Sequence, residues 1–125
     1  MSTIKANTLL HSDGSTTNPP AIPALDQRMA KAWCSYQGND NTLSNSFNVS
    51  SVTDVATGTF TVNYTTSMSN DKHITVASTS VSSGAARNIV AGARPASTST
   101  ADLMVETSTG AAHDQSNISF IAFDN

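Results

Sequence analysis

The 125-residue chain is poor in charge and in cysteine, and both shortages exclude classes of functional site. Asp, Glu, Lys and Arg make up 12% of the residues, and the six Lys and Arg residues are scattered, so no basic surface for nucleic acid can be assembled. One cysteine, Cys34, excludes an intrachain disulfide and a zinc site made of several cysteines. No apolar run approaches the roughly 20 residues of a membrane-spanning helix, and no signal-peptide pattern opens the chain. We therefore expect a soluble protein, made in a cytosol, that binds neither nucleic acid nor membrane.

Sequence motifs of catalysis and of cofactor binding are absent as well. The chain has no G-x-S-x-G nucleophile motif, no glycine-rich phosphate-binding motif and no D-x-D-x-D-G calcium loop. The histidines His11, His73 and His113 lie far apart and show no metal-ligand spacing, so we expect them on the surface. His113 and Asp114 form the single adjacent histidine–carboxylate pair, in an expected loop. We predict no enzyme activity, no cofactor and no dedicated metal site; a weak structural Ca²⁺ site in one of the Asp-containing turns stays open as an alternative.

Serine and threonine are abundant, at about 29% of the residues, and they alternate with apolar residues from Ala32 onward. Alternation with a period of two places one set of side chains on each face of a β-strand. The clearest case is a hairpin with strands at Ser46–Asp54, bulged between Ser50 and Ser51, and at T-F-T-V-N-Y. About seven strands at roughly ten-residue spacing predict an all-β head at 32–125, an antiparallel β-sandwich or jelly-roll. The other expected strands are A-W-C-S-Y, H-I-T-V-A-S, A-R-N-I-V-A-G, T-A-D-L-M-V-E-T and N-I-S-F-I-A-F.

The expected core of this head is thin. The alternation assigns to it Trp33, Phe47, Val49, Phe60, Val62, Ile74, Val76, Ile89, Leu103, Val105, Ile118 and Phe120. In the last strand, Ile121 and Phe123 are the alternative inward pair. Tyr36, Tyr64, Met104, Ile121 and Phe123 have no inward position in this scheme. Because apolar side chains that gather on a surface mark an interface, we expect association of copies to contribute to stability.

Residues 1–31 have a different character, because no strand or long helix can be built from most of them. The segment N-P-P-A-I-P contains three prolines and predicts a stiff, polyproline-like linker. Leu25 and Met29, four residues apart, suit a helical turn that is too short to be stable alone. The segment is either a disordered tail or an extended arm that becomes ordered on another chain through Ile4, Leu9 and Leu10. We favour the arm.

Two parts of the chain resemble proteins of phage particles. M-S-T-I-K-A-N-T-L-L-H-S-D-G-S is similar to the N-terminal leader of many phage and cyanophage virion proteins. Residues 32–80 resemble the small C-terminal β-domain of phage tail fibres, with its Ala-Trp start, Ser-Phe-Asn-Val-Ser-Ser strand, Thr-Asp turn, glycine and Thr-Val-Asn-Tyr strand. In this sequence those motifs fall on Ala32-Trp33, Ser46–Ser51, Thr53-Asp54, Gly58 and Thr61–Tyr64. Fibre proteins normally carry a long shaft, and this chain has none.

The resemblance implies a homotrimeric virion protein without catalytic activity: a short fibre or tail-fibre-like appendage, docked by its arm on another virion protein and contributing to host adsorption. A capsid decoration, cement or head-fibre protein is an alternative within this class. A free carbohydrate-binding module with Trp33, Tyr36 or Tyr64 as its sugar platform is an alternative outside it. The predicted virion-docking residues are Ile4, Leu9 and Leu10, and the predicted trimer-interface residues are Leu25, Met29, Trp33 and Tyr36. The predicted receptor loops, with a host surface glycan as ligand, contain Asn39, Asp40, Asn70, Asp71, His113 and Asp114.

Overall fold

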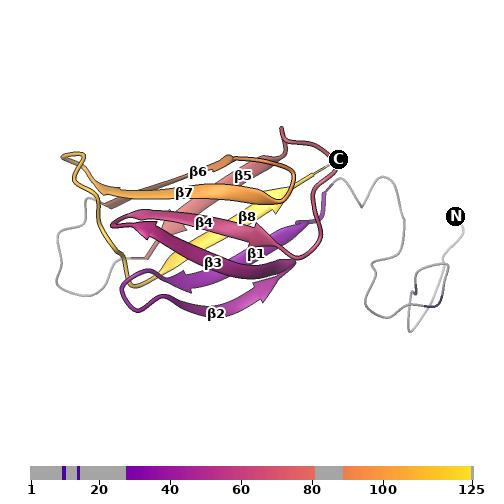
Figure 1. The fold of residues 1–125 in the computed structure, drawn as a ribbon, viewed down its shortest axis with the longest axis horizontal. Coiled ribbons are helices and arrows are strands. Elements are labelled where there is room, and N and C mark those ends of the chain that lie inside the picture. Colours follow the sequence, from indigo (N-terminus) through magenta and orange to yellow (C-terminus); the bar gives the residue numbers. More distant parts are fainter. Residues whose placement is uncertain (1–9, 11–13, 15–27, 81–88, 125) are drawn as a thin grey trace, which may run out of the picture.

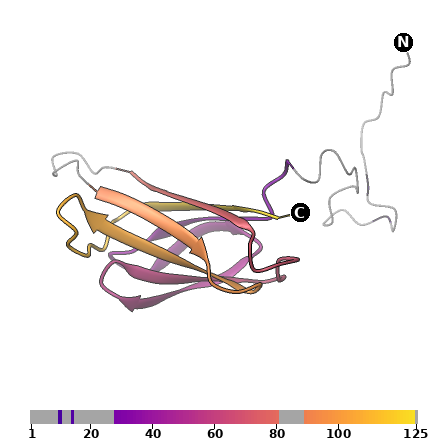
Figure 2. The same cartoon turned by 90° about the horizontal axis from the view of Figure 1, so that it is seen from above.

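Every regular element of the computed structural model is a β-strand, over the residues that it describes: 10, 14, 28–80 and 89–124. Eight antiparallel strands form two sheets that lie one over the other (Figures 1 and 2). The β1 sheet has the order β2-β1-β8-β5, and the β4 sheet has the order β3-β4-β7-β6. The bounds are β1 Ala32–Gln37, β2 Thr42–Phe47, β3 Val49–Ala56, β4 Thr59–Tyr64, β5 Ile74–Thr79, β6 Ile89–Pro95, β7 Thr100–Thr107 and β8 Ile118–Phe123. The predicted all-β sandwich is confirmed, with one strand more than the seven expected.

The sandwich has two distinct ends. At the proximal end the chain enters β1, and Lys31 N–H donates to the Ala122 carbonyl at 2.8 Å. Asn48, the β4–β5 loop at 65–73 and the β6–β7 turn at 96–99 lie at this end too, because Thr65 N–H donates to the Asn48 carbonyl and Met68 N–H to the Thr98 carbonyl. The distal end contains the turns at 38–41 and 57–58 and the β7–β8 loop at 108–117. Figure 1 shows β8 ending beside the start of β1.

Alternate side chains of the central strands form the core. β4 contributes Phe60, Val62 and Tyr64, and β7 contributes Ala101, Leu103 and Val105, all at most 7% exposed. The β1 sheet contributes Ala32, Cys34 and Tyr36 from β1, and Ile118, Phe120 and Ala122 from β8. The rings of Tyr36 and Phe60 meet edge-on across the two layers, with centroids 5.3 Å apart. The predicted inward positions in β4, β7 and β8 are therefore confirmed.

The strand predicted at Ser46–Asp54 is wrong, because the chain crosses from one sheet to the other at Asn48. Asn48 has a φ of +54°, which bends the chain between β2 and β3. Its side chain supports the bend: Nδ2 donates to the carbonyls of Lys31 at 2.9 Å and Thr66 at 3.0 Å, and Oδ1 accepts from Thr66 N–H at 2.7 Å. The predicted bulge is present, as a shift of register between Val49 and Ser51.

Four side chains predicted to be inward point outward instead. Trp33, Phe47, Ile74 and Val76 are 37%, 44%, 65% and 51% exposed. Register explains the error, since residues that face each other across an antiparallel pair share a face. Val76 faces Ile121, and Ala77 faces the buried Phe120, so Thr75, Ala77 and Thr79 supply the inner side of β5.

Three side chains predicted to be outside lie in the core. Tyr36, 1% exposed, donates its hydroxyl to Asn41 Oδ1 at 2.7 Å, so it cannot contribute to a trimer interface or a sugar platform. Tyr64 and His73 are buried as a pair, with 2.9 Å between the Tyr64 hydroxyl and His73 Nε2. His73 Nδ1 lies 3.1 Å from the Asn70 carbonyl. Because a carbonyl oxygen can only accept, Nδ1–H donates to it, and the Tyr64 hydroxyl satisfies the other ring nitrogen.

Candidate functional site

The outer face of the β1 sheet carries an apolar row that crosses all four strands. Phe47 of β2 faces Trp33 of β1, Trp33 faces Ile121 of β8, and Ile121 faces Val76 of β5. These four residues are called the apolar row below. Ile74 and Phe123, which face each other, extend it toward the proximal end. Single exposed apolar residues are ordinary, but here four exposed ones, Trp33, Phe47, Ile74 and Val76, and the partly buried Ile121 and Phe123 form a continuous patch on one face.

The four strands of this sheet contain no Asp, Glu, Lys, Arg or His. The β4 sheet differs, because Asp54, Arg94, Asp102 and Glu106 lie in its strands. Charged residues are depleted at the centre of protein–protein interfaces, since burying a charge costs free energy unless it is paired. The outer face of the β1 sheet thus has the composition typical of the centre of a protein–protein interface.

A hollow of about 380 Å³ lies on the same face, distal to the apolar row. The next row of the sheet is polar but small, with Ser35 facing Asn45 and Ser119 facing both Ser35 and Ser78. Small side chains next to large ones leave a depression, and its lining includes Trp33, Ser35, Val76, Ser78, Ser119 and Ile121. An indole beside a row of hydroxyl groups can accept either a large apolar side chain or the face of a sugar.

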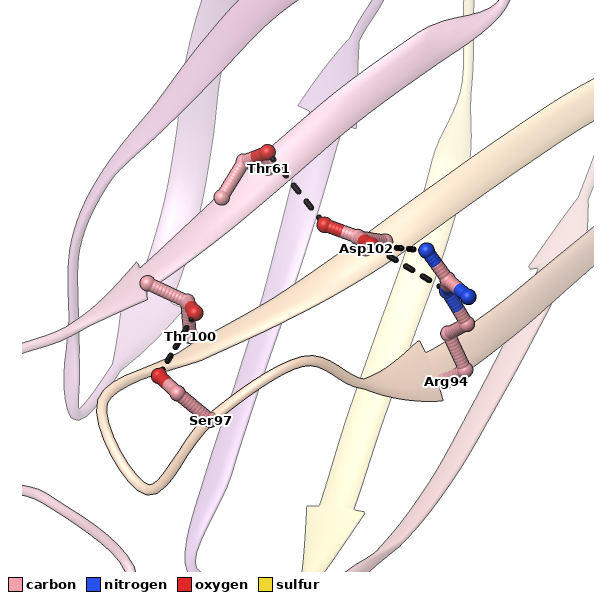
Figure 3. A network of polar contacts seen from close by, with 5 residues as sticks. All are labelled: Thr61, Arg94, Ser97, Thr100 and Asp102. Atoms are coloured by element: carbon pink, nitrogen blue, oxygen red, sulfur yellow. Dashed lines mark hydrogen bonds and ion pairs between the residues drawn. The ribbon is translucent and has the colours of Figure 1, made fainter. Parts of the chain in front are cut away.

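The outer face of the β4 sheet carries polar pairs that satisfy one another, together with the exposed Val90 and Met104. Asp102 of β7 accepts from Arg94 Nη2 at 2.8 Å and Nε at 3.1 Å, and Thr61 of β4 reaches its other oxygen at 3.5 Å (Figure 3). The Ser97 and Thr100 hydroxyls meet at 2.8 Å in the adjoining turn. The Arg94 side chain is 75% exposed, so this ion pair contributes little to stability. The charged and hydroxyl groups of Thr61, Arg94 and Asp102 on this face thus have partners within the sheet.

The structure separates the predicted receptor loops into two groups. Asn39, Asp40, His113 and Asp114 lie at the distal end, where Gly38 N–H donates to the carbonyl of Gln115 at 2.9 Å. Asn70 and Asp71 lie at the proximal end, with Asn70 Nδ2 donating to Asp124 Oδ1 at 3.0 Å. The three loops therefore do not form one binding surface.

Several polar groups of these loops already have structural partners. Asp114 Oδ1 accepts from Gly58 N–H at 2.6 Å and Asp40 Oδ1 from Thr42 N–H at 3.2 Å. Asn70 Oδ1 accepts from Lys72 N–H at 2.7 Å. Asp71 forms an exposed ion pair with Lys72 at 3.5 Å, and Asn39 and His113 are exposed. At the distal end, this leaves Asn39 and His113 as the side chains best placed to meet a ligand.

The remaining predicted site residues are distributed as follows. Ile4, Leu9 and Leu25 lie outside the described residues. Leu10 and Met29 are 48% and 40% exposed, and Trp33 belongs to the apolar row. Sequence reasoning missed Phe47, Ile74 and Val76 as surface residues, whereas it left Ile121 outside the core in one of its two assignments of the last strand. A signal for them was present, because the strands that carry them contain no charge at all.

Burial keeps three side chains of the core, Cys34, Tyr36 and Tyr64, in their protonated forms. Burial raises the pKa of the Cys34 thiol to about 12 and raises the pKa of the Tyr64 hydroxyl, to which the neighbouring Cys34 and Asp124 charges also contribute. Burial, and then the charges of three aspartates led by Asp54, raises the pKa of Tyr36. All three groups therefore stay neutral at neutral pH, which disfavours nucleophilic attack by Cys34.

Among residues 28–80 and 89–124, no three His, Cys, Asp or Glu side chains come close enough together to hold a metal ion. The described part of the chain also contains no helix long and apolar enough to cross a bilayer. The apolar row and the adjoining hollow are consequently the best-defined candidate site. No protein-family model, curated protein or solved structure matches the chain.

Proposed function

We propose that the protein is a structural component of a phage particle: a homotrimeric short fibre or tail-fibre-like appendage that acts by assembly and not by catalysis. One observation carries the proposal, the uncharged apolar face of the β1 sheet, where Trp33 is 37% exposed and Ile74 is 65% exposed. A protein that works by packing against others needs such a face. The resemblance of residues 32–80 to fibre β-domains supplies the virion setting, and that of residues 1–15 supplies a docking arm.

The place where the chain enters the sandwich supports different roles for its two ends, with the proximal end toward the particle and the distal end toward the host. Lys31 leads into β1 at the proximal end, so an anchored arm would hold that end toward the particle. Asn39 and His113, exposed at the distal end, would then point away from it and make any contact with a host glycan. Asn70 and Asp71 would face the particle.

A carbohydrate-binding module remains the second candidate, because one observation favours it. The hollow beside Trp33 combines an aromatic face with the hydroxyls of Ser35, Ser78 and Ser119. The aromatic part of this candidate is smaller than the sequence indicated, since Tyr36 and Tyr64 are buried. A site with one indole would bind a sugar weakly and would need several copies to act together.

Deleting residues 1–20 tests the proposed function. Mass spectrometry of gradient-purified particles should detect the full chain and should miss the deletion variant, while the purified variant keeps its circular dichroism spectrum and its oligomer mass. Particles that contain no full chain, or that take up the deletion variant normally, would contradict the proposal. Glycan binding by a monomeric full chain, measured by calorimetry, would favour the carbohydrate-binding module.

A further inference from the structure

We propose that the outer face of the β1 sheet is the surface through which copies of this chain associate, the apolar row of one copy packing on the apolar row of the next. This inference rests on the homotrimeric function proposed above and names the surface that would form the trimer. It replaces Tyr36, which is buried, by Phe47, Val76 and Ile121 around Trp33.

The area of the patch matches the apolar part of a standard interface. With exposed fractions of 37% for Trp33, 44% for Phe47, 65% for Ile74 and 51% for Val76, and roughly 150–250 Å² for a large side chain, the patch exposes about 400 Å². A stable interface buries about 800 Å² on each partner, of which about 57% is apolar. These four side chains therefore supply nearly the whole apolar share of one such contact, and in a threefold assembly that area is divided between the two neighbouring chains.

The absence of charge on the β1 sheet's outer face indicates that its partner is also uncharged, as is the same face of another copy. A partner that carried Asp, Glu, Lys or Arg opposite this face would bury those charges without a counter-charge, since the four strands contain none. The outer face of the β4 sheet is excluded by this argument, because it presents Arg94, Asp102 and Glu106. Within the described residues, the β1 sheet's own face is the partner that matches it.

The width of the sheet is suited to a threefold arrangement. Four strands spaced by about 4.8 Å make a face roughly 19 Å wide. Three such faces around an axis enclose a triangular prism whose walls lie about 5.5 Å from the axis, close to half of the ~10 Å that separates two packed sheets. Large side chains such as Trp33, Phe47 and Ile121 fill this space. The hollow next to the row offers room for an apolar side chain of a neighbouring copy.

Val76 and Val90 provide a matched pair of variants. Both are exposed, at 51% and 62%, and both lie in edge strands, Val76 on the outer face of the β1 sheet and Val90 on that of the β4 sheet. Val76→Asp places a charge in the proposed contact, whereas Val90→Asp places the same charge on the polar face. We expect sedimentation equilibrium at micromolar concentration to give a multiple of 13.0 kDa for wild type and Val90→Asp, and a single chain for Val76→Asp.

Fluorescence gives a second readout, because Trp33 is the single tryptophan of the chain. In the assembly the indole is covered, so its emission should shift to shorter wavelength as protein concentration rises. Its Stern–Volmer constant for acrylamide should be lower in wild type than in Val76→Asp, because Trp33 is 37% exposed in the single chain and covered in the assembly. Phe47→Ser is a second variant on the same row, and the far-ultraviolet circular dichroism spectrum reports whether each variant is folded.

The outcomes separate the inference from the proposed function. A wild-type oligomer that folded Val76→Asp and Phe47→Ser leave intact overturns the inference and leaves the homotrimer standing. A wild-type monomer overturns both, and shielding of Trp33 in that monomer would assign the face to another segment of the same chain. If Val76→Asp dissociates the oligomer but the chain is absent from purified particles, the inference is supported and the virion function is refuted. If the wild-type mass corresponds to two chains and Val76→Asp reduces it to one, the proposed contact surface is supported and the assembly is a dimer instead of a trimer.

Discussion

Replacing Asn48 tests the account of how the chain passes from one sheet to the other. Asn48→Ala removes three side-chain hydrogen bonds, two donated to the Lys31 and Thr66 carbonyls and one accepted from the Thr66 amide. It also places an alanine at a φ of +54°, where a β-carbon crowds the following carbonyl oxygen. Asn48→Gly removes the same hydrogen bonds but tolerates the backbone conformation.

The two substitutions separate the side-chain and backbone contributions. Three hydrogen bonds at the partly exposed proximal end contribute about 2 kcal/mol in total, toward the lower end of the usual range. The left-handed conformation costs alanine a further 1–2 kcal/mol, roughly. Asn48→Ala should therefore lower the free energy of unfolding by about 3–4 kcal/mol, a large fraction of the ~5–15 kcal/mol typical of a domain. Asn48→Gly should cost about 1 kcal/mol less.

Urea denaturation followed by circular dichroism measures these losses. At an m-value of about 1.5 kcal/mol/M, Asn48→Ala should lower the midpoint by about 2 M. Protein concentration has to be the same for every variant, because association adds to apparent stability. Asn39→Ala is the control: Asn39 is exposed in the β1–β2 turn, its φ is not positive, and its replacement should change stability by less than about 0.5 kcal/mol.

Two results would refute the reasoning about Asn48. An Asn48→Ala protein within about 1 kcal/mol of wild type would mean that the three bonds do not hold the crossing. A glycine variant no more stable than the alanine variant would mean that the left-handed backbone is not under strain.

Two further predictions concern the distal turn and alkaline pH. Gly58→Ala should lower the free energy of unfolding by about 3 kcal/mol or more, because at a φ of +67° its β-carbon would meet the Val105 carbonyl and lie 2.6 Å from His113 N. Gly92→Ala is the control: Gly92 has open space around it, so its replacement should leave the stability measured in the same urea assay unchanged or slightly raised. Equal losses of stability in the two variants would contradict the packing argument. The raised pKa of Cys34 means that the folded chain keeps a proton that the unfolded chain loses above pH 9.0, so stability is fully present below that pH and should fall by about 1.4 kcal/mol per pH unit toward pH 12. The raised pKa of Tyr64 acts in the same direction at still higher pH, and a Cys34→Ala variant that loses stability as steeply as wild type between pH 9 and pH 10 would disprove the thiol's part.

Much of the fold could be predicted because β4 and β7 alternate without ambiguity. Phe60, Val62 and Tyr64 are separated by Thr61 and Asn63, so one face of β4 is clearly apolar. β5 could not be assigned in this way, because both of its faces suit a partly buried strand: Ile74 and Val76 on one, Thr75 and Ala77 on the other. The pairing with β8 decides between them, and pairing is a property of the assembled sheet.

The buried polar side chains were unpredictable for a related reason. Tyr36 and His73 are tolerated in the interior because Asn41, Tyr64 and Asn70 satisfy their polar atoms. These partners are supplied by turn geometry that the residue spacing does not reveal. The crossing at Asn48 is similar, since neither glycine nor proline marks it and the αL conformation is stabilised by contacts with Lys31 and Thr66, distant in sequence.

The lack of Asp, Glu, Lys, Arg and His in the strands of the β1 sheet has a kinetic consequence. Without electrostatic steering, two such faces meet at the unguided rate of roughly 10⁵–10⁶ M⁻¹s⁻¹. The same lack of charge means that dissolved ions have nothing to screen. An association on this face should therefore depend little on charge screening by salt.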